Sequence, residues 1–244
     1  RIADKVITVS DPMKGHLISL GYESEKIRAV PNAVDHEKYD PGRKEFSDDK
    51  VKKFREKIGV GDDPMVFFIG RLTWVKGVEN LVRAMTIVRD EIPEAKLVIL
   101  GQGGQAESID DIVETENLED NVIRKYEFVD EEERLMYYAA SDLAVFPSRY
   151  EPFGIVCTEA MSMGKPVVVG AKGISGFREQ VVASGPDRCG SHANPEDPND
   201  IAKFIIEILK DDELREKMGK NARQRVLNNY TLDKVANHTL RIYE

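Results

Sequence analysis

The sequence contains few of the residues that cross-link small proteins or bind metals. Its 244 residues include 2 cysteines, Cys157 and Cys189, and only 4 histidines. Neither cysteine belongs to a metal-ligand spacing, so we expect no disulfide framework and no zinc site, and we interpret both as reduced thiols in the core of a cytoplasmic protein. The histidines are scattered along the chain, and each is more typical of a surface or core position than of a catalytic base.

Basic residues are outnumbered by acidic ones, and long apolar runs are scarce. The 35 Lys and Arg residues are outnumbered by 44 Asp and Glu, giving a net charge of −9, which argues against nucleic acid as a partner because such proteins need a basic face. No uncharged apolar stretch approaches the ~18 residues of a transmembrane helix. With 41% hydrophobic residues, the chain has enough apolar surface to fold into one large or two small domains.

Several catalytic signatures are missing as well. The chain has no Walker loop, no Gly-x-Ser-x-Gly and no His-Glu-x-x-His pattern, so those three kinds of active site are not indicated. It also has no Asp-x-Asp pair to hold a metal-bound diphosphate. We therefore expect a site without a metal or other cofactor.

Short apolar runs alternate with helical patterns along most of the chain. Strands are expected over residues 5–9, 27–30, 65–69, 96–100, 122–128, 143–147 and 166–169, and helices over 47–58, 78–89, 109–116, 200–210, 214–227 and 232–243. The runs at 66–69 and 167–169 are apolar throughout, which is typical of parallel strands covered by helices on both faces. The alternation predicts an α/β fold with a Rossmann-like, doubly wound parallel sheet, in which ligands bind beyond the carboxyl ends of the strands.

Two stretches are expected to separate these elements. Residues 31–64 pass from Pro-Asn-Ala-Val-Asp into a charged helix and a turn, and we interpret them as connecting an N-terminal remnant, residues 1–36, to the main domain, residues 37–244. Residues 184–198 are rich in Gly, Pro, Ser and Asn and predict a surface loop. Because the chain begins with Arg1, we expect it to be part of a longer protein.

The loop after the strand at 65–69 reads Gly-Arg-Leu-Thr-Trp-Val-Lys-Gly, residues 70–77. Gly70 lets the chain turn where the strand ends, and the loop leads into a helix whose N-terminal N–H groups favour phosphate. Arg71 and Lys76 add two positive charges at this edge of an acidic protein, as an anionic ligand requires. An ordinary loop with two solvated cations remains the alternative.

A second loop, after the strand at 143–147, carries two carboxylates. Glu151 precedes the tight turn Pro-Phe-Gly, and Glu159 falls in the second turn of the following helix. Eight helical residues span at most ~12 Å, so a hydrolase pair, which needs ~5–9.5 Å, remains open, but two carboxylates that bind different sugars of one ligand fit better. The alternative is a Glu at a helix N-terminus and a surface Glu, although the apolar neighbours of Glu159 make an unpartnered carboxylate costly.

Two further glycine-containing loops are weaker signals. Residues 173–179, Gly-Ile-Ser-Gly-Phe-Arg-Glu, follow a strand and lead into an expected helical run at 178–182. They suggest a third loop at the same crevice, although an ordinary strand-to-helix turn is the simpler interpretation. Residues 101–104, Gly-Gln-Gly-Gly, lack the full Gly-x-Gly-x-x-Gly spacing and are a weak dinucleotide signature.

Taken in order, the two stronger motifs resemble a known family. Gly-Arg-Leu at 70–72 with Lys76, and Glu-Pro-Phe-Gly at 151–154 with Glu159, resemble the retaining glycosyltransferases of the GT-B fold, glycosyltransferase family 4 or group 1, in their archaeal, glycogen-synthase-like branch. The resemblance covers nearly the whole chain. Further matching stretches lie at residues 3–10, 30–35, 97–103, 128–130 and 140–143.

The resemblance implies a role for each motif residue. It implies that Arg71 and Lys76 hold the diphosphate of a nucleotide-sugar donor, and that Glu159 accepts hydrogen bonds from the ribose hydroxyls. Glu151 contacts the transferred sugar and is the implied catalytic residue. The remaining implied donor-binding positions are Gly70 in the first loop, Phe128 and Val129 beside the base, and the backbone N–H groups of Phe153, Gly154 and Ile155.

The resemblance also implies an architecture and a reaction. The family fold has two Rossmann-like domains that face a cleft, and this chain resembles the second, with the last strand and helix of the first. Its implied function is to bind a UDP- or ADP-sugar and, with the missing domain, to transfer the hexose to a hydroxyl acceptor without a metal. We expect the isolated chain to be inactive. The alternatives are a GT-B epimerase or phosphorylase, a non-catalytic nucleotide-sugar-binding domain, and a glycoside hydrolase.

Overall fold

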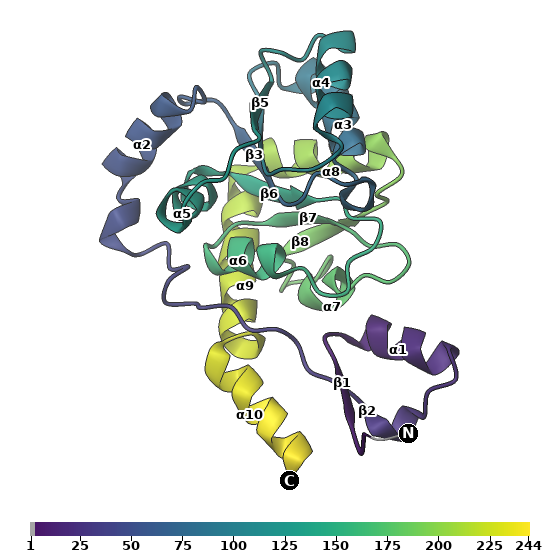
Figure 1. The fold of residues 1–244 in the computed structure, drawn as a ribbon. Helices are drawn as coiled ribbons and strands as arrows, with labels where there is room; N and C mark the ends of the chain where they lie inside the picture. Colours follow the sequence, from purple (N-terminus) through teal and green to yellow (C-terminus); the bar gives the residue numbers. More distant parts are fainter. Residues whose placement is uncertain (1–2) are drawn as a thin grey trace.

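The computed structural model describes residues 3–244, which form a large α/β domain and a smaller N-terminal unit (Figure 1). The large domain is built on six parallel strands in the order β5-β4-β3-β6-β7-β8. The strands are β3 (Met65–Ile69), β4 (Lys96–Leu100), β5 (Val122–Lys125), β6 (Leu143–Phe146), β7 (Val167–Gly170) and β8 (Gly190–Ala193). The doubly wound parallel sheet expected from the sequence is confirmed.

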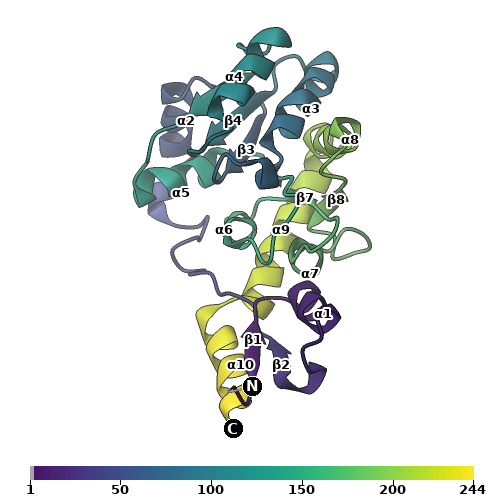
Figure 2. The same cartoon turned by 45° about the vertical axis from the view of Figure 1, so that its right-hand side comes forward.

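Helices cover both faces of this sheet because its strands are apolar on both sides. All of β7 and all but the last residue of β3 are buried. The covering helices are α2 (Asp48–Lys57), α3 (Val78–Glu91), α4 (Ala106–Thr115), α5 (Glu131–Ala140), α6 (Ile155–Ser162), α7 (Phe177–Gln180), α8 (Pro198–Leu209) and α9 (Asp212–Asn229). α3 packs against α4 and α8, while α6 packs against α9 and α2 against α5 (Figure 2).

The structure corrects several predicted boundaries. The predicted surface loop at 184–198 is wrong, because it contains β8, a buried strand whose polar, glycine-containing sequence resembles a turn. The strand predicted over 122–128 ends at Lys125, which leaves Phe128 in a loop. The helical run expected at 178–182 is the single turn α7. Helix α5 was not anticipated, although the side chain of Asp130 caps it by accepting a hydrogen bond from the backbone N–H of Glu133 at 2.8 Å.

The N-terminal unit is attached to the large domain at two places. It consists of β1 (Val6–Thr8), α1 (Asp11–Ser19), the short 3₁₀ turn η1 (Ser24–Lys26) and β2 (Ile27–Ala29), with β1 and β2 in parallel. Ser10 donates a hydrogen bond to the carbonyl of Pro152 at 2.6 Å, and the backbone N–H of Asp11 donates to Glu179 at 2.6 Å. A β-bridge joins Val34 to Thr231, at the start of the C-terminal helix.

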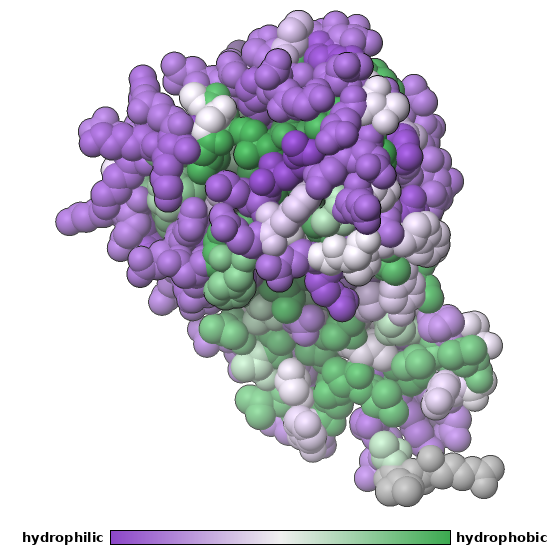
Figure 3. All heavy atoms as spheres, turned by 45° about the horizontal axis from the view of Figure 1, so that its top comes forward, coloured by the Kyte–Doolittle hydropathy of each residue, from purple (hydrophilic) through white to green (hydrophobic). Residues whose placement is uncertain are grey.

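Apolar side chains are exposed on this unit and on the C-terminal helix α10 (Leu232–Tyr243). The helix extends from the large domain on the same side as the N-terminal unit (Figures 1 and 2). Figure 3 shows apolar surface gathered over this lower part of the molecule, in contrast to the polar surface of the large domain. The exposed residues are Ile7, Ile18, Leu20, Tyr22, Leu232, Leu240 and Tyr243.

The structure also bears on the expectations for the cysteines and for membrane-spanning helices. Cys157 and Cys189 are both buried and unpaired, as expected of core thiols. Within residues 3–244, no helix combines the length and the apolar character needed to cross a bilayer.

The close packing of β8 on β7 predicts that Gly190 is essential to the sheet edge. A Cβ atom at this position would lie 2.4 Å from the carbonyl oxygen of Val167. We expect Gly190→Ala to lower the free energy of unfolding by about 1–3 kcal/mol in urea denaturation, because overpacking forces the strands apart. Gly104→Ala is the control, since a Cβ there meets nothing within 4 Å. Equal stabilities of the two variants would show that β8 is packed differently.

Candidate functional site

The two stronger sequence motifs meet where the strand order reverses. From β3 the chain continues to β4 and β5 on one side, and from β6 it continues to β7 and β8 on the other. Such a switch point, beyond the carboxyl ends of the strands, is where open α/β sheets bind ligands. The loop after β3 carries Arg71 and Lys76, and the loop after β6 carries Glu151, so these motifs lie at the expected binding edge.

The glycines at 101–104 allow the loops after β3 and β4 to touch. Gly101 has a φ of 150°, and a Cβ there would lie 1.9 Å from the carbonyl oxygen of Gly70. A Cβ on Gly103 would lie 2.2 Å from the carbonyl oxygen of Leu72. The backbone N–H of Leu72 donates to the carbonyl oxygen of Gln102 at 2.8 Å. Gly101 and Gly103 therefore serve backbone packing between the two loops.

The loop after β3 also packs directly on the loop after β6. It ends in the 3₁₀ turn η3 (Trp74–Lys76) and in Gly77, which has a left-handed φ of 67°. A Cβ on Gly77 would lie 2.3 Å from the carbonyl oxygen of Pro147, at the end of β6. The backbone N–H of Arg149 donates to the carbonyl of Val75 at 2.8 Å. The two loops therefore form one continuous edge.

Lys76 and Glu151 form an ion pair across this edge. The Lys76 Nζ lies 2.5 Å from the Glu151 Oε2, and the two side chains are only 21% and 11% exposed. A pair of partly desolvated charges is screened less by solvent than a surface ion pair. The structure thus joins the residue expected to bind the diphosphate to the residue expected to contact the sugar.

The third glycine-containing loop holds Glu151 from the other side. The backbone N–H of Glu151 donates to the carbonyl of Ile174 at 3.1 Å, and the N–H of Gly176 donates to the carbonyl of Glu151 at 2.8 Å. The loop at 173–179 therefore lies at the same edge of the sheet and fixes the backbone beneath the Lys76–Glu151 pair.

The start of α6 presents backbone N–H groups that no other part of residues 3–244 accepts. The N–H groups of Phe153, Gly154 and Ile155 have no hydrogen-bond partner there. Gly154 takes a left-handed φ of 89°, and a Cβ on it would lie 2.2 Å from the ring of Phe177. Because a helix N-terminus carries a partial positive charge, these groups are suited to an anion.

Glu159 is enclosed rather than open. The residue is 8% exposed, and both of its carboxylate oxygens accept hydrogen bonds from tyrosines. The Tyr39 hydroxyl donates to Oε1 at 2.8 Å, and the Tyr138 hydroxyl donates to Oε2 at 2.6 Å. Burial beside this carboxylate raises the pKa of both tyrosines above their usual range, so the two hydroxyls stay protonated.

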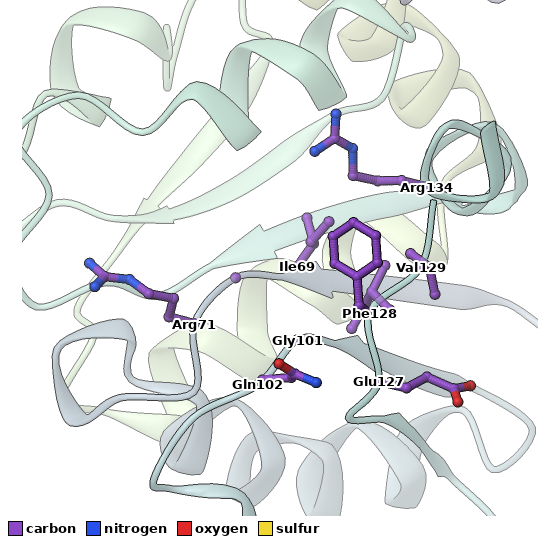
Figure 4. Close-up of a pocket in the computed structure, with 10 residues that line it drawn as sticks. Ile69, Arg71, Gly101, Gln102, Glu127, Phe128, Val129 and Arg134 are labelled. Atoms are coloured by element: carbon purple, nitrogen blue, oxygen red, sulfur yellow. The ribbon is translucent and has the colours of Figure 1, made fainter. Parts of the chain in front are cut away.

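A cavity of about 400 Å³ opens beside the loops after β3, β4 and β5 (Figure 4). It holds four of the expected donor-binding residues: Gly70, Arg71, Phe128 and Val129. Phe128 is 88% exposed at the cavity's edge. The other lining residues are Ile69, Leu100, Gly101, Gln102, Glu127 and Arg134. In Figure 4 the side chains of Arg71 and Arg134 lie on different sides of the cavity.

The expected site residues therefore fall into three groups. One group lines this cavity, Lys76, Glu151 and the N–H groups of α6 lie around the switch point, and Glu159 lies between Tyr39 and Tyr138. Sequence reasoning missed Tyr39, Tyr138 and Arg134, which belong to segments whose local patterns indicate only an aromatic core or a charged helix. Among the described residues, no group of three or more His, Cys, Asp or Glu side chains is arranged to hold a metal ion.

Comparisons with known proteins show what the chain is similar to. Residues 50–225 match the family described as glycosyl transferases group 1. An uncharacterized glycosyltransferase of Methanocaldococcus jannaschii is 34% identical over 242 residues, a match that covers 98% of this chain and 60% of that protein.

Solved structures share the fold. Sucrose-phosphate synthase from Thermosynechococcus elongatus is 30% identical with a TM-score of 0.83, covering 99% of this chain and 58% of that one. HepE of Anabaena, solved in complex with UDP and glucose, has a TM-score of 0.85 at 22% identity, covering 98% of this chain and 62% of that one. The chain thus spans about three fifths of the length of the proteins it resembles.

The partly buried Lys76–Glu151 pair predicts measurable coupling between the two side chains. In a double-mutant cycle of Lys76→Met and Glu151→Gln, we expect urea denaturation to give a coupling energy of about 1–3 kcal/mol. The control is the Glu216–Lys220 pair, whose side chains are 74% and 78% exposed, and which should couple by less than ~0.5 kcal/mol. Coupling as weak as the control's would contradict the pairing of the two loops through these residues.

Proposed function

The chain belongs to the glycosyltransferase group 1 family, and we propose that it is the donor-binding domain of a retaining hexosyltransferase. In this proposal it binds a UDP- or ADP-sugar and supplies one wall of the site that transfers the hexose to a hydroxyl acceptor. It belongs to the archaeal, glycogen-synthase-like branch that its motifs resemble. The observation that carries the proposal is the pairing of Lys76 with Glu151 next to the open N–H groups of α6, at the switch point of the sheet.

The donor diphosphate is assigned to the positive edge of the site. Arg71 and Lys76 place two cationic side chains on one loop, with Lys76 paired to Glu151, and the first turn of α6 supplies N–H groups and a partial charge. Charge-assisted hydrogen bonds from such groups are the strong ones. They neutralise the diphosphate as it leaves, so the proposed transfer needs no metal. HepE of Anabaena was solved with UDP on a similar fold, which supports a nucleoside diphosphate as the ligand.

The base, the ribose and the hexose of the donor are assigned to residues that flank the proposed diphosphate position. The base enters the cavity beside Phe128 and Val129, and the ribose hydroxyls donate to Glu159 in this proposal. Glu151 contacts the transferred hexose, held in place by Lys76 and by the backbone of the third loop. The acceptor attacks from the face of the leaving phosphate, which assists the transfer, so no protein nucleophile is required.

The N-terminal unit is assigned to the first domain of the complete enzyme. Residues 1–36 are its remnant and residues 37–244 are the donor domain in this proposal. The exposed apolar side chains of the unit and of α10 support it, since large exposed apolar patches mark interaction surfaces. A cytoplasmic location is also proposed, supported by the two free buried cysteines.

Nucleotide binding tests the donor assignment directly. We expect calorimetric titration of the chain to detect UDP or ADP, with GDP as the third ligand. Arg71→Ala should weaken that binding about 10-fold or more, because a charge-assisted contact to the diphosphate is lost. Arg83→Ala is the control, since Arg83 is exposed on α3 and makes the same change in net charge. The donor site is refuted by the absence of binding, and the role of Arg71 by equal affinities of the two variants.

The chain without the remainder of the first domain should bind donor but not transfer it. We expect no labelled hexose in any product when the chain is incubated with a labelled donor that it binds in calorimetry. A sugar product formed at a rate comparable to that of the complete enzyme would show that residues 1–244 hold the whole active site.

A further inference from the structure

The segment that joins the N-terminal unit to the large domain touches the carboxylate assigned to the ribose. Tyr39 lies in this segment, between Val34 and α2, and its hydroxyl donates to the Glu159 Oε1 at 2.8 Å. Tyr138, from α5, donates to Oε2 at 2.6 Å. The two tyrosine rings meet edge to face, with centroids 5.8 Å apart. Glu159 is therefore held between an element of the domain and the connecting segment.

Arg134 fixes the direction of the Tyr39 hydrogen bond. Its Nη2 lies 2.9 Å from the Tyr39 hydroxyl oxygen and donates to it. A tyrosine hydroxyl has a single hydrogen, and a guanidinium only donates. With its oxygen accepting from Arg134, the hydroxyl of Tyr39 directs its hydrogen to Glu159. Arg134 also lines the cavity assigned to the base, so the three side chains connect that cavity to the carboxylate.

The backbone of Tyr39 is anchored independently of its side chain. Its carbonyl oxygen accepts from the Ser162 hydroxyl at 2.9 Å and from the Arg223 Nη1 at 2.8 Å. Ser162 is the last residue of α6, the helix that also carries Glu159, and Arg223 belongs to α9. The connecting segment is thus fixed to α6 at the point where its side chain reaches the carboxylate.

Glu159 is buried and makes no direct salt bridge within residues 3–244, and Arg134 acts on it electrostatically from behind the Tyr39 hydroxyl. A buried carboxylate depends on its hydrogen bonds. A carboxylate has about four acceptor positions, and the two tyrosines use one on each oxygen. No other donor within residues 3–244 occupies the positions that remain.

We propose that Tyr39 is a positioning residue of the donor site, which together with Tyr138 holds the Glu159 carboxylate in the orientation that accepts the ribose hydroxyls of a nucleoside diphosphate. This inference rests on the proposed function. It has a consequence for the whole enzyme, because the path of residues 35–40 then sets the position of a ligand-binding carboxylate. A shift of the connecting segment changes nucleotide affinity without any change in the residues that touch the nucleotide.

The test compares hydroxyl deletions with two forms of the ligand. Tyr39→Phe and Tyr138→Phe each remove one hydrogen bond to Glu159 and keep the ring. Tyr137→Phe is the matched control, because the Tyr137 hydroxyl is buried and has no hydrogen-bond partner. Each variant is titrated calorimetrically with UDP and with 2′,3′-dideoxy-UDP, or with the ADP pair if the wild-type chain prefers ADP. Thermal unfolding is recorded for each variant.

We expect Tyr39→Phe and Tyr138→Phe to bind UDP about 5- to 20-fold more weakly than the wild-type chain. Their affinity for 2′,3′-dideoxy-UDP should equal that of the wild type, since this ligand has no hydroxyl to offer Glu159. Tyr137→Phe should bind both ligands as the wild type does.

Two results overturn the inference while the proposed function stands. One is an affinity of Tyr39→Phe for UDP equal to that of Tyr137→Phe. The other is an equal loss for UDP and its dideoxy form, which indicates a general structural effect. If the wild-type chain binds none of UDP, ADP and GDP, the proposed function fails and the inference fails with it.

Discussion

The contact between the loops after β3 and β6 is the constraint on which the site depends. Parallel strands bring both loops to one edge of the sheet, and the reversal of strand order makes them neighbours. Gly77 allows its loop to approach the carbonyl of Pro147, where a Cβ would lie 2.3 Å from the oxygen. Lys76 and Glu151, which are 75 positions apart in the sequence, then pair at 2.5 Å. In a protein of net charge −9, Arg71 and Lys76 are thus two cations at the proposed donor site.

Helix α6 connects the separate parts of this arrangement. Its first turn presents free N–H groups, its middle carries Glu159, and its last residue, Ser162, holds the carbonyl of Tyr39. The diphosphate, the ribose and the connecting segment are therefore assigned to one rigid element. A helix limits the relative movement of the groups that contact one ligand. This favours binding, because these groups lose little conformational entropy when the ligand binds.

The sequence predicted the sheet and the two motifs because their signals are local. Continuous apolar runs indicate the buried strands β3 and β7. Arg71 and Lys76 are recognisable because they follow such a strand directly in the sequence. β8 was missed because it is short and its Gly190 is required by packing against Val167, a contact that is distant in sequence. The hydrogen bonds from Tyr39 and Tyr138 to Glu159 could not be predicted for the same reason, since Tyr39 and Glu159 are separated by 120 positions. No local pattern shows which aromatic residues have hydroxyls that point to a buried carboxylate.

A crystal structure of the chain with UDP tests the proposed donor site most directly. We expect the diphosphate between Arg71, Lys76 and the first turn of α6, the base beside Phe128 and Val129, and the ribose hydroxyls on Glu159. Density for UDP in this place, with both tyrosines still hydrogen-bonded to the carboxylate, is the expected result. A diphosphate bound away from the switch point, with the Lys76–Glu151 edge untouched, would contradict it.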